Sequence, residues 1–235
     1  ADLVLSVLVP AEAVEVARRV AQALEATGAG TPFADCNAVS PQSAQVMEAN
    51  IAAAGGRFID ASIVGSPPRN GSSPRFYASG EHATEFEEMA GFGLDVRNIG
   101  PNIGQASGIK MCYAAMTKGS SALYSELLMA AEMMGLSDFV KAEFQSSQPA
   151  ILQRMERGLP GVPAKARRWV SEMEEIKDTF DHLGLTPHLF QGVADMYRMI
   201  GSTSMGDETP ESRDPERSLE ETIRVLAEWV QAHPA

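Results

Sequence analysis

One lysine stands out among the residues that could do chemistry. Lys110 lies in the stretch GIKMCYAAMTKG, residues 108 to 119, where most neighbouring side chains are small or apolar. On a helix it would share a face with Ala114 and Thr117, which leaves a small, weakly polar groove around the amine. An ammonium there can bind an anion, donate a hydrogen bond to a carbonyl, or act as a general acid or base. The alternative is a solvated lysine whose stem packs while its head group reaches water.

Two other segments could approach a ligand. The stretch IDASIVGSPPRNGSS reads as a strand that ends at Gly65 and Ser66, where glycine lets the backbone come close to a bound molecule. The stretch ADCNAVSP offers Asn37 and Ser40 at a strand-to-helix turn. Carboxyl ends of strands in open α/β sheets are where ligands bind. Equally, the first stretch could be an ordinary surface loop, and Ser40 could simply cap its helix.

The composition limits the classes of function. The chain has 235 residues, 44% of them hydrophobic, and a net charge of −12 from 19 basic and 31 acidic residues. This balance argues against nucleic acid or an anionic membrane as the main partner. No apolar run is long enough to span a bilayer, and the start of the chain has no signal-peptide pattern. The two cysteines, Cys36 and Cys112, are far apart, which favours reduced thiols in a cytoplasmic protein. The four histidines show no metal-binding spacing, so we expect no metal site.

The first part of the chain alternates strands with helices. The apolar or β-branched runs predict strands at residues 2–9, 31–37, 57–65, 75–80 and 94–100. Between them, helical spacing with caps predicts helices at residues 11–28, 40–56 and 82–93. This alternation predicts βαβ units and a mostly parallel sheet.

After Pro101 the pattern becomes helical. Residues 103–135 read as one long helix, and only helical periodicity follows it, apart from a polar loop at residues 205–218. The fold class expected is therefore α/β plus all-α, with a partial Rossmann-type parallel sheet, a long bridging helix and a helical C-terminal domain. The predicted segments are residues 1–101 for the partial Rossmann-type sheet, 102–135 for the bridging helix with Lys110, and 136–235 for the all-α domain.

The α/β part lacks one expected feature of a dinucleotide-binding sheet. No GxGxxG motif follows a strand, and the GAG at residues 28–30 ends a helix instead. The chain also opens on a buried-type strand. If this sheet binds a dinucleotide, we expect its first βαβ portion to lie outside this sequence.

Taken in order, these motifs resemble a known family. Val9-Pro10 is similar to its proline-containing turn after a strand, residues 35–41 to its D-x-[S/T]-T-x-x-P, and residues 58–66 to its F-x-D-A-P-V-S-G-G. Gly100, Gly104 and Lys110 are similar to the opening of its long helix with the catalytic lysine. The chain resembles the β-hydroxyacid dehydrogenases and the related 6-phosphogluconate dehydrogenases. It is most similar to a poorly characterised branch with its own C-terminal helical domain, on the signature RRWVSEMEEIKDTFDHLGLTPH.

The resemblance implies an activity and a site. A nicotinamide cofactor, NAD or NADP, would exchange a hydride with a hydroxyl or carbonyl compound, and Lys110 would be the general acid or base. The all-α part would make a homodimer. The implied cofactor-binding residues are Val9, Pro10 and Asn37. The implied substrate-binding residues are Val64, Gly65, Ser66, Tyr113, Ala114 and Thr117.

Some positions depart from the family pattern. Ala114 stands where the family has a substrate-orienting asparagine, and Val64 stands where it has the serine that binds the substrate carboxylate. Asn37 and Ala38 replace a hydroxyl pair near the cofactor, and a second family lysine aligns near Ser171. We therefore expect a larger or less charged substrate, with Val64 and Tyr113 shaping an apolar side.

Two other functions remain open at this point. The chain could be a non-catalytic binding or assembly protein that has lost its cofactor half, although an uncovered apolar strand at residues 2–9 would invite aggregation. It could also be an imine reductase on the same scaffold. Lys110 disfavours this reading, because relatives with that activity often replace the lysine.

Overall fold

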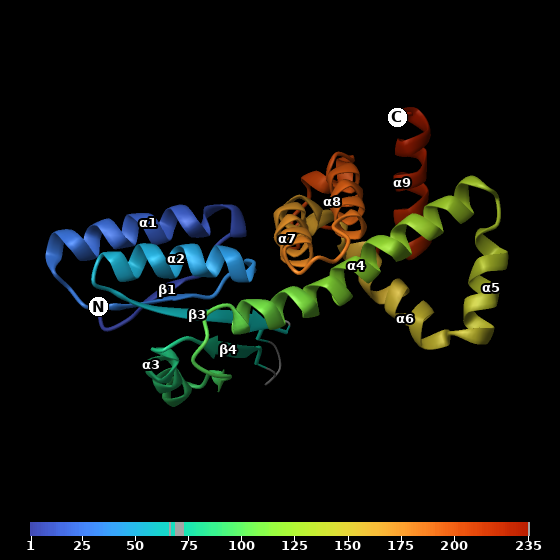
Figure 1. The fold of residues 1–235 in the computed structure, drawn as a ribbon. Helices are drawn as coiled ribbons and strands as arrows, with labels where there is room; N and C mark the ends of the chain where they lie inside the picture. Colours follow the sequence, from blue (N-terminus) through green and yellow to red (C-terminus); the bar gives the residue numbers. More distant parts are fainter. Residues whose placement is uncertain (66, 69–72, 235) are drawn as a thin grey trace. The chain divides into compact units, whose positions relative to one another are not determined.

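The fold of the α/β part is an open sheet. A computed structural model describes residues 1–65, 67–68 and 73–234 (Figure 1). Within them, strands pair in the order β1-β2-β3-β4-β5, and every pair is parallel except β3 with β4. This arrangement confirms the mostly parallel, partial Rossmann-type sheet. The strands are β1 (Val4–Ser6), β2 (Pro32–Asp35), β3 (Arg57–Val64), β4 (Arg75–Ser79) and β5 (Asp95–Asn98).

The first two strands are shorter than the apolar runs predict, and one side chain explains why. Asn37 Oδ1 accepts a hydrogen bond from the Leu8 backbone N–H at 2.6 Å, which takes that group out of the sheet ladder. The Asn37 backbone N–H in turn donates to Asp35 at 3.2 Å. A polar turn residue therefore ends both strands by offering the backbone a local partner.

Helices cover both faces of the sheet. α1 (Pro10–Thr27) and α2 (Pro41–Ala53) lie on one face, and α3 (Ala83–Glu87) lies on the other (Figure 1). Both long helices begin with proline at the first helical position, where its missing N–H costs nothing. Ser40 caps α2, with its hydroxyl accepting from the Ser43 N–H at 3.1 Å.

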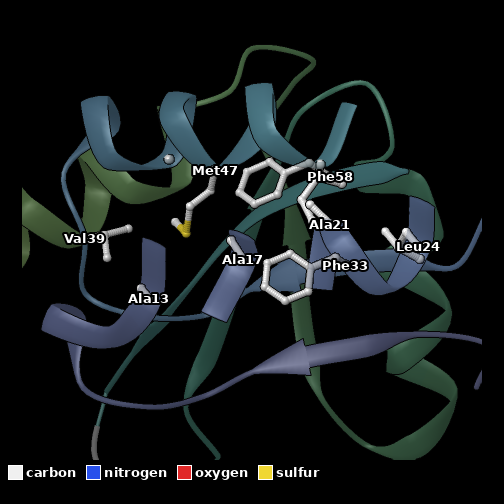
Figure 2. Packing of buried hydrophobic residues seen from close by; sticks show 10 residues of the cluster. Ala13, Ala17, Ala21, Leu24, Phe33, Val39, Met47 and Phe58 are labelled. Atoms are coloured by element: carbon white, nitrogen blue, oxygen red, sulfur yellow. The ribbon is translucent and has the colours of Figure 1, made fainter. Parts of the chain in front are cut away.

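The core beneath α1 and α2 combines small and large side chains. Phe33 and Phe58 pack with ring centroids 6.1 Å apart, next to Met47 of α2 (Figure 2). Alanines at positions 13, 17 and 21 form the buried stripe of α1 and let that helix approach the sheet closely. Complementary volumes of this kind give interiors their close packing.

The rest of the chain is helical, as predicted. The long helix α4 spans Gln105–Met133, close to the expected 103–135. None of the helices in the described ranges is both long and apolar enough to cross a bilayer. The remaining helices are α5 (Ser137–Ser147), α6 (Pro149–Gly158), α7 (Pro163–His182), α8 (His188–Gly201) and α9 (Leu219–Ala232), with 3-10 turns at Glu88–Phe92, Leu159–Gly161 and Ser204–Asp207.

The chain divides into two compact units. The first contains Ala1–Ala114 and Glu174–Pro187, and the second contains Ala115–Met173 and His188–Ala235. The division therefore falls inside both α4 and α7. The three segments expected from the sequence, 1–101, 102–135 and 136–235, stay a prediction.

Candidate active site

Four polar side chains stand in one row across the sheet. Ser6 is in register with Asp35, Asp35 with Asp60, and Asp60 with Ser79. All four are buried. Residues in register present their side chains on the same face, so the row runs under the face that α2 covers. Buried carboxylates need internal partners, and the structure provides them.

Asp60 is the best-satisfied member of this row. Its carboxylate accepts hydrogen bonds from Ser79 Oγ at 2.9 Å and from the Gly104 N–H at 2.8 Å. Ser107 donates twice, from its N–H at 3.2 Å and from its hydroxyl at 2.6 Å. Burial raises the pKa of Asp60, and these hydrogen bonds oppose that shift. The carboxylate thus receives the otherwise unsatisfied donors at the start of α4 and ties that helix to β3.

From this anchor, α4 runs along β3 and carries Lys110. The Ser62 hydroxyl donates to the Ala106 carbonyl at 2.8 Å, and one helical turn later Lys110 Nζ donates to the Ile63 carbonyl at 2.6 Å. Lys110 is partly buried. The ammonium therefore lies near the carboxyl end of β3, the strand that the motifs indicate for the substrate.

The amide of Asn37 is largely used within the protein. Besides its bond with Leu8, Asn37 donates from Nδ2 to Ser6 Oγ at 2.8 Å and to Asp35 at 2.6 Å. Burial raises the pKa of Asp35 to about 6, against the effect of these hydrogen bonds. Burial also raises the pKa of the Cys36 thiol. Asn37 thus fixes the carboxyl ends of β1 and β2, and its contact with a cofactor stays a prediction.

The other predicted cofactor residues flank this turn. Val9 precedes α1 and is 43% exposed, whereas Pro10 is buried as the first residue of the helix. Asn37 is bonded to Leu8, the residue before Val9, so the structure brings these three predicted residues to the ends of β1 and β2.

The predicted substrate residues are less uniform. Val64 is only 2% exposed, and Gly65 adopts a φ of +126°, which glycine accommodates without strain. Ser66 lies outside the described residues. Tyr113 is 43% exposed and Ala114 is buried. Thr117 belongs to the second unit.

Helix α2 is held beside the start of α4. Gly104 has a φ of +96°, and a Cβ there would lie 3.0 Å from Cβ of Pro41, so a side chain would force the two helices apart. Glu175 of α7 completes this corner. Its Oε2 accepts from the Ser40 N–H at 2.7 Å and from the Ser43 hydroxyl at 2.9 Å. The carboxylate sits at the positive end of α2, where a negative charge is favourable.

A second lysine of α4 has different surroundings in the helical unit. Lys118 is ion-paired with Glu172, and both side chains are largely buried. Lys118 Nζ also lies 5.3 Å from the Trp169 ring centroid, within cation–π range. Its backbone carbonyl accepts from the Tyr197 hydroxyl at 2.6 Å. These contacts join α4, α7 and α8 within that unit.

The helical unit also contains an open hollow. Its volume is about 690 Å³, and it lies between α4 and α8. Three of its lining side chains, Met116, Leu123 and Leu189, are apolar yet at least 58% exposed. Exposed apolar surface of this kind marks a place where a partner or ligand can bind.

Sequence reasoning missed several of these residues. Asp60 lies within the F-x-D-A match, but nothing in the pattern indicates that it holds α4. The pairs Ser40–Glu175 and Lys118–Glu172 join residues far apart in the chain. No local spacing signals such contacts. A polar residue on a buried strand was the one available sign for Asp60, because buried charges need partners.

The chain is similar in sequence to proteins without an assigned activity. Residues 131–200 match a family described as a domain of unknown function (DUF1932). An uncharacterised 28.5 kDa protein of Methanothermus fervidus is 24% identical over 200 residues, which is 85% of this chain and 76% of that protein.

Solved structures extend the likeness to the fold. A conserved hypothetical protein of Sinorhizobium meliloti is 25% identical, with a TM-score of 0.71 over 97% of this chain and 75% of that one. A conserved protein of unknown function, described as structurally similar to 3-hydroxyacid dehydrogenases, is 29% identical, with a TM-score of 0.65 over 86% and 75%. The 3-hydroxyisobutyrate dehydrogenase of Mycobacterium tuberculosis shares the fold at 18% identity, with a TM-score of 0.62 over 96% and 79%. These comparisons confirm the resemblance of this chain to the hydroxyacid dehydrogenase superfamily.

Proposed function

We propose that this protein is an oxidoreductase that transfers a hydride between a nicotinamide cofactor and a hydroxyl or carbonyl compound, with Lys110 as general acid and base. One observation carries most weight. The Lys110 ammonium lies 2.6 Å from the Ile63 carbonyl near the carboxyl end of β3, on a helix that Asp60 anchors. Lysine in a partly buried position can both donate a proton and stabilise a developing negative charge.

Three residues at the ends of β1 and β2, Val9, Pro10 and Asn37, would contact the proposed cofactor. When bound, the cofactor supplies or accepts the hydride. The turns that lead into α1 and α2 contain no glycine-rich cradle for a diphosphate, so cofactor binding is itself part of the proposal. The choice between NAD and NADP stays open.

The proton chemistry would belong to Lys110. In the reducing direction, the ammonium donates a hydrogen bond to the substrate carbonyl oxygen and then transfers its proton to the alkoxide that forms. In the oxidising direction, the neutral amine accepts the proton from the hydroxyl group. The Ile63 carbonyl holds Nζ in place through either step. Such positioned proton transfer contributes about 10²- to 10⁴-fold to a rate.

A substrate screen tests this proposal. The protein purified from its native gene would be assayed with NADH and NADPH against a panel of oxo acids, ketones and aldehydes. Lys110→Met should reduce kcat/KM about 10²- to 10⁴-fold for any substrate that is turned over. Lys141→Met is the matched control, because Lys141 is exposed and its ion pair with Glu220 lies on the surface. Equal turnover by Lys110→Met and the wild type would contradict the proposal, as would no turnover of any compound.

We also propose a homodimer formed through the helical part. The exposed apolar side chains around the hollow, Met116, Leu123 and Leu189, support this idea. Light scattering should give twice the 25.1 kDa chain mass for the wild type, and the monomer mass for Leu123→Glu. A monomeric wild-type protein would refute it. A cytoplasmic location stays a prediction.

A further inference from the structure

Arg75 is a cation that the motifs do not account for. It is the first residue of β4 and lies in register with Val64, the last residue of β3. Two positions along, Ser62 is in register with Tyr77, and then Asp60 with Ser79. Residues in register present their side chains on one face. Ser62, Ser79 and Asp60 all bond to the first turns of α4, so Arg75 stands on the face along which α4 runs.

The Arg75 side chain has a buried donor without a partner. Its Nε makes no hydrogen bond, and no ion pair of this side chain is found among the described residues. Arg57, whose Nε is also buried without a partner, at least pairs with Glu85 at 3.2 Å. Asp95, in register with Arg75 on the other side, is held instead by Arg97 at 3.3 Å. A buried donor without a partner indicates a missing acceptor.

The path of α4 brings Lys110 toward this arginine. Ala106 bonds to Ser62, and Lys110, four residues later, bonds to Ile63. Four residues of helix advance about 6 Å, and two residues of strand advance about 6.6 Å. Lys110 therefore lies alongside the last row of β3 and β4, which is the row of Val64 and Arg75. Both cations thus belong to the same end of β3, in a chain whose net charge is −12.

We propose that Arg75 binds a carboxylate of the substrate, while Lys110 serves the reacting oxygen. This inference rests on the proposed function for the role of Lys110. A guanidinium forms two parallel hydrogen bonds with a carboxylate. It therefore selects carboxylates more strongly than a serine hydroxyl does. The replacement of the family serine by Val64 suggested a less charged substrate. Arg75, opposite Val64, would bind the substrate carboxylate in place of the missing serine hydroxyl. The ligand is then an oxo or hydroxy acid.

Binding without added nucleotide tests the role of Arg75 apart from catalysis. Acetoacetate and its methyl ester serve as probes, because they differ in the carboxylate charge and share the carbonyl group. By calorimetry, the wild type should bind the acid more tightly than the ester. Arg75→Gln should weaken binding of the acid about 10- to 100-fold, the range for a hydrogen-bonded charge, and leave the ester unchanged. Arg18→Gln, which changes an exposed arginine on α1, is the matched control and should behave as the wild type.

A second variant keeps the test valid if Arg75→Gln folds poorly. Arg75→Lys retains the charge without the planar fork, and it should bind the acid with intermediate affinity. Equal binding of acid and ester by the wild type would overturn the inference, as would an unchanged preference in both Arg75 variants. An acid preference that depends on Arg75 in a chain without turnover would support the anion site and refute only the proposed activity. Turnover that does not depend on Arg75 would support the proposed activity and refute the anion site.

Discussion

Two lysines of the same helix contact different groups. Lys110 donates to the backbone carbonyl of Ile63, whereas Lys118, eight residues later, is ion-paired with the buried carboxylate of Glu172. The hydrogen bond to the Ile63 carbonyl orients the Lys110 ammonium at the end of β3. The buried carboxylate of Glu172 neutralises Lys118, and that pair becomes part of the core.

This difference separates a chemical role from a structural one. The start of α4 is bonded to Asp60 of β3. This attachment positions the Lys110 ammonium near the end of the same strand. The contacts of Lys118 with Glu172 and Trp169 hold helices together within the helical unit. We expect substitutions near Lys118 to change stability most, and substitutions of Lys110 to change activity most.

The largest expected change in stability comes from breaking the buried ion pair. Glu172→Ala leaves the Lys118 ammonium buried without its carboxylate. The free energy of unfolding should fall by about 3 to 5 kcal/mol, measured by urea denaturation. The surface substitution Glu228→Ala, which breaks an exposed pair with Arg224, is the control and should cost less than about 0.5 kcal/mol.

A double variant sharpens this test. Lys118→Met combined with Glu172→Leu removes both charges and should recover most of the lost stability, because no charge is then left buried. If Glu172→Ala were as stable as the wild type, the pair would not be part of the core. Lys118 would then have no structural role to contrast with the chemical role of Lys110.

The next largest effect is a pH dependence in the α/β unit. Burial raises the pKa of Asp35 to about 6, above its ordinary value of 3.8. The folded protein therefore binds this proton more tightly than the unfolded chain does. Its stabilising contribution is complete below about pH 4 and is lost as the pH rises to about 6, by at most about 3 kcal/mol. Asp35→Asn should remove this slope, as measured by urea unfolding at each pH.

An exposed carboxylate provides the comparison for that slope. Asp95→Asn changes a residue that is exposed and paired with Arg97 on the surface. Its variant should keep the wild-type slope between pH 4 and 6. A slope that survives in Asp35→Asn would assign it to another group, and Asp60 would be the next residue to change.

The smallest expected effect on stability tests the anchor of α4. Ser107→Ala removes the hydroxyl that donates to Asp60 at 2.6 Å but keeps the backbone donor. Loss of one hydrogen bond to a charged group should cost about 1.5 to 3 kcal/mol, measured by thermal or urea unfolding. Ser120→Ala, which removes a weak contact of a hydroxyl with the Met116 sulfur at 3.8 Å, should cost almost nothing. Equal effects of the two substitutions would contradict the anchoring role of Asp60.

Much of the fold could be predicted because its helices and strands follow local sequence patterns. The apolar run around Phe58 predicts β3, and the cap and proline at Ser40 predict the start of α2. The length of α4 follows from a stretch that has no proline and tolerates Gly108 and Gly119. Strand ends were less predictable. Leu8 is apolar enough to continue β1, yet Asn37, 29 residues away, takes its N–H.

The candidate site could be predicted only in part. The small residues around Lys110 distinguish it, and its place near the end of β3 agrees with the motifs. The partners that define its surroundings come from distant segments: Asp60 lies 47 residues from Ser107, and Glu175 lies 135 residues from Ser40. Arg75 gives no signal in the sequence, because only the register of β4 against β3 reveals which row it occupies. Contacts between distant residues depend on the fold, which local spacing does not encode.

The most direct test compares Lys110→Met with Lys118→Met in the same two measurements. The account predicts that Lys110→Met loses about 10²- to 10⁴-fold in kcat/KM with little change in unfolding free energy. It predicts that Lys118→Met loses about 3 to 5 kcal/mol of stability and keeps its activity at temperatures where it is folded. If Lys110→Met retains full activity, or if both variants lose activity and stability in parallel, the proposed division between a chemical and a structural lysine is wrong.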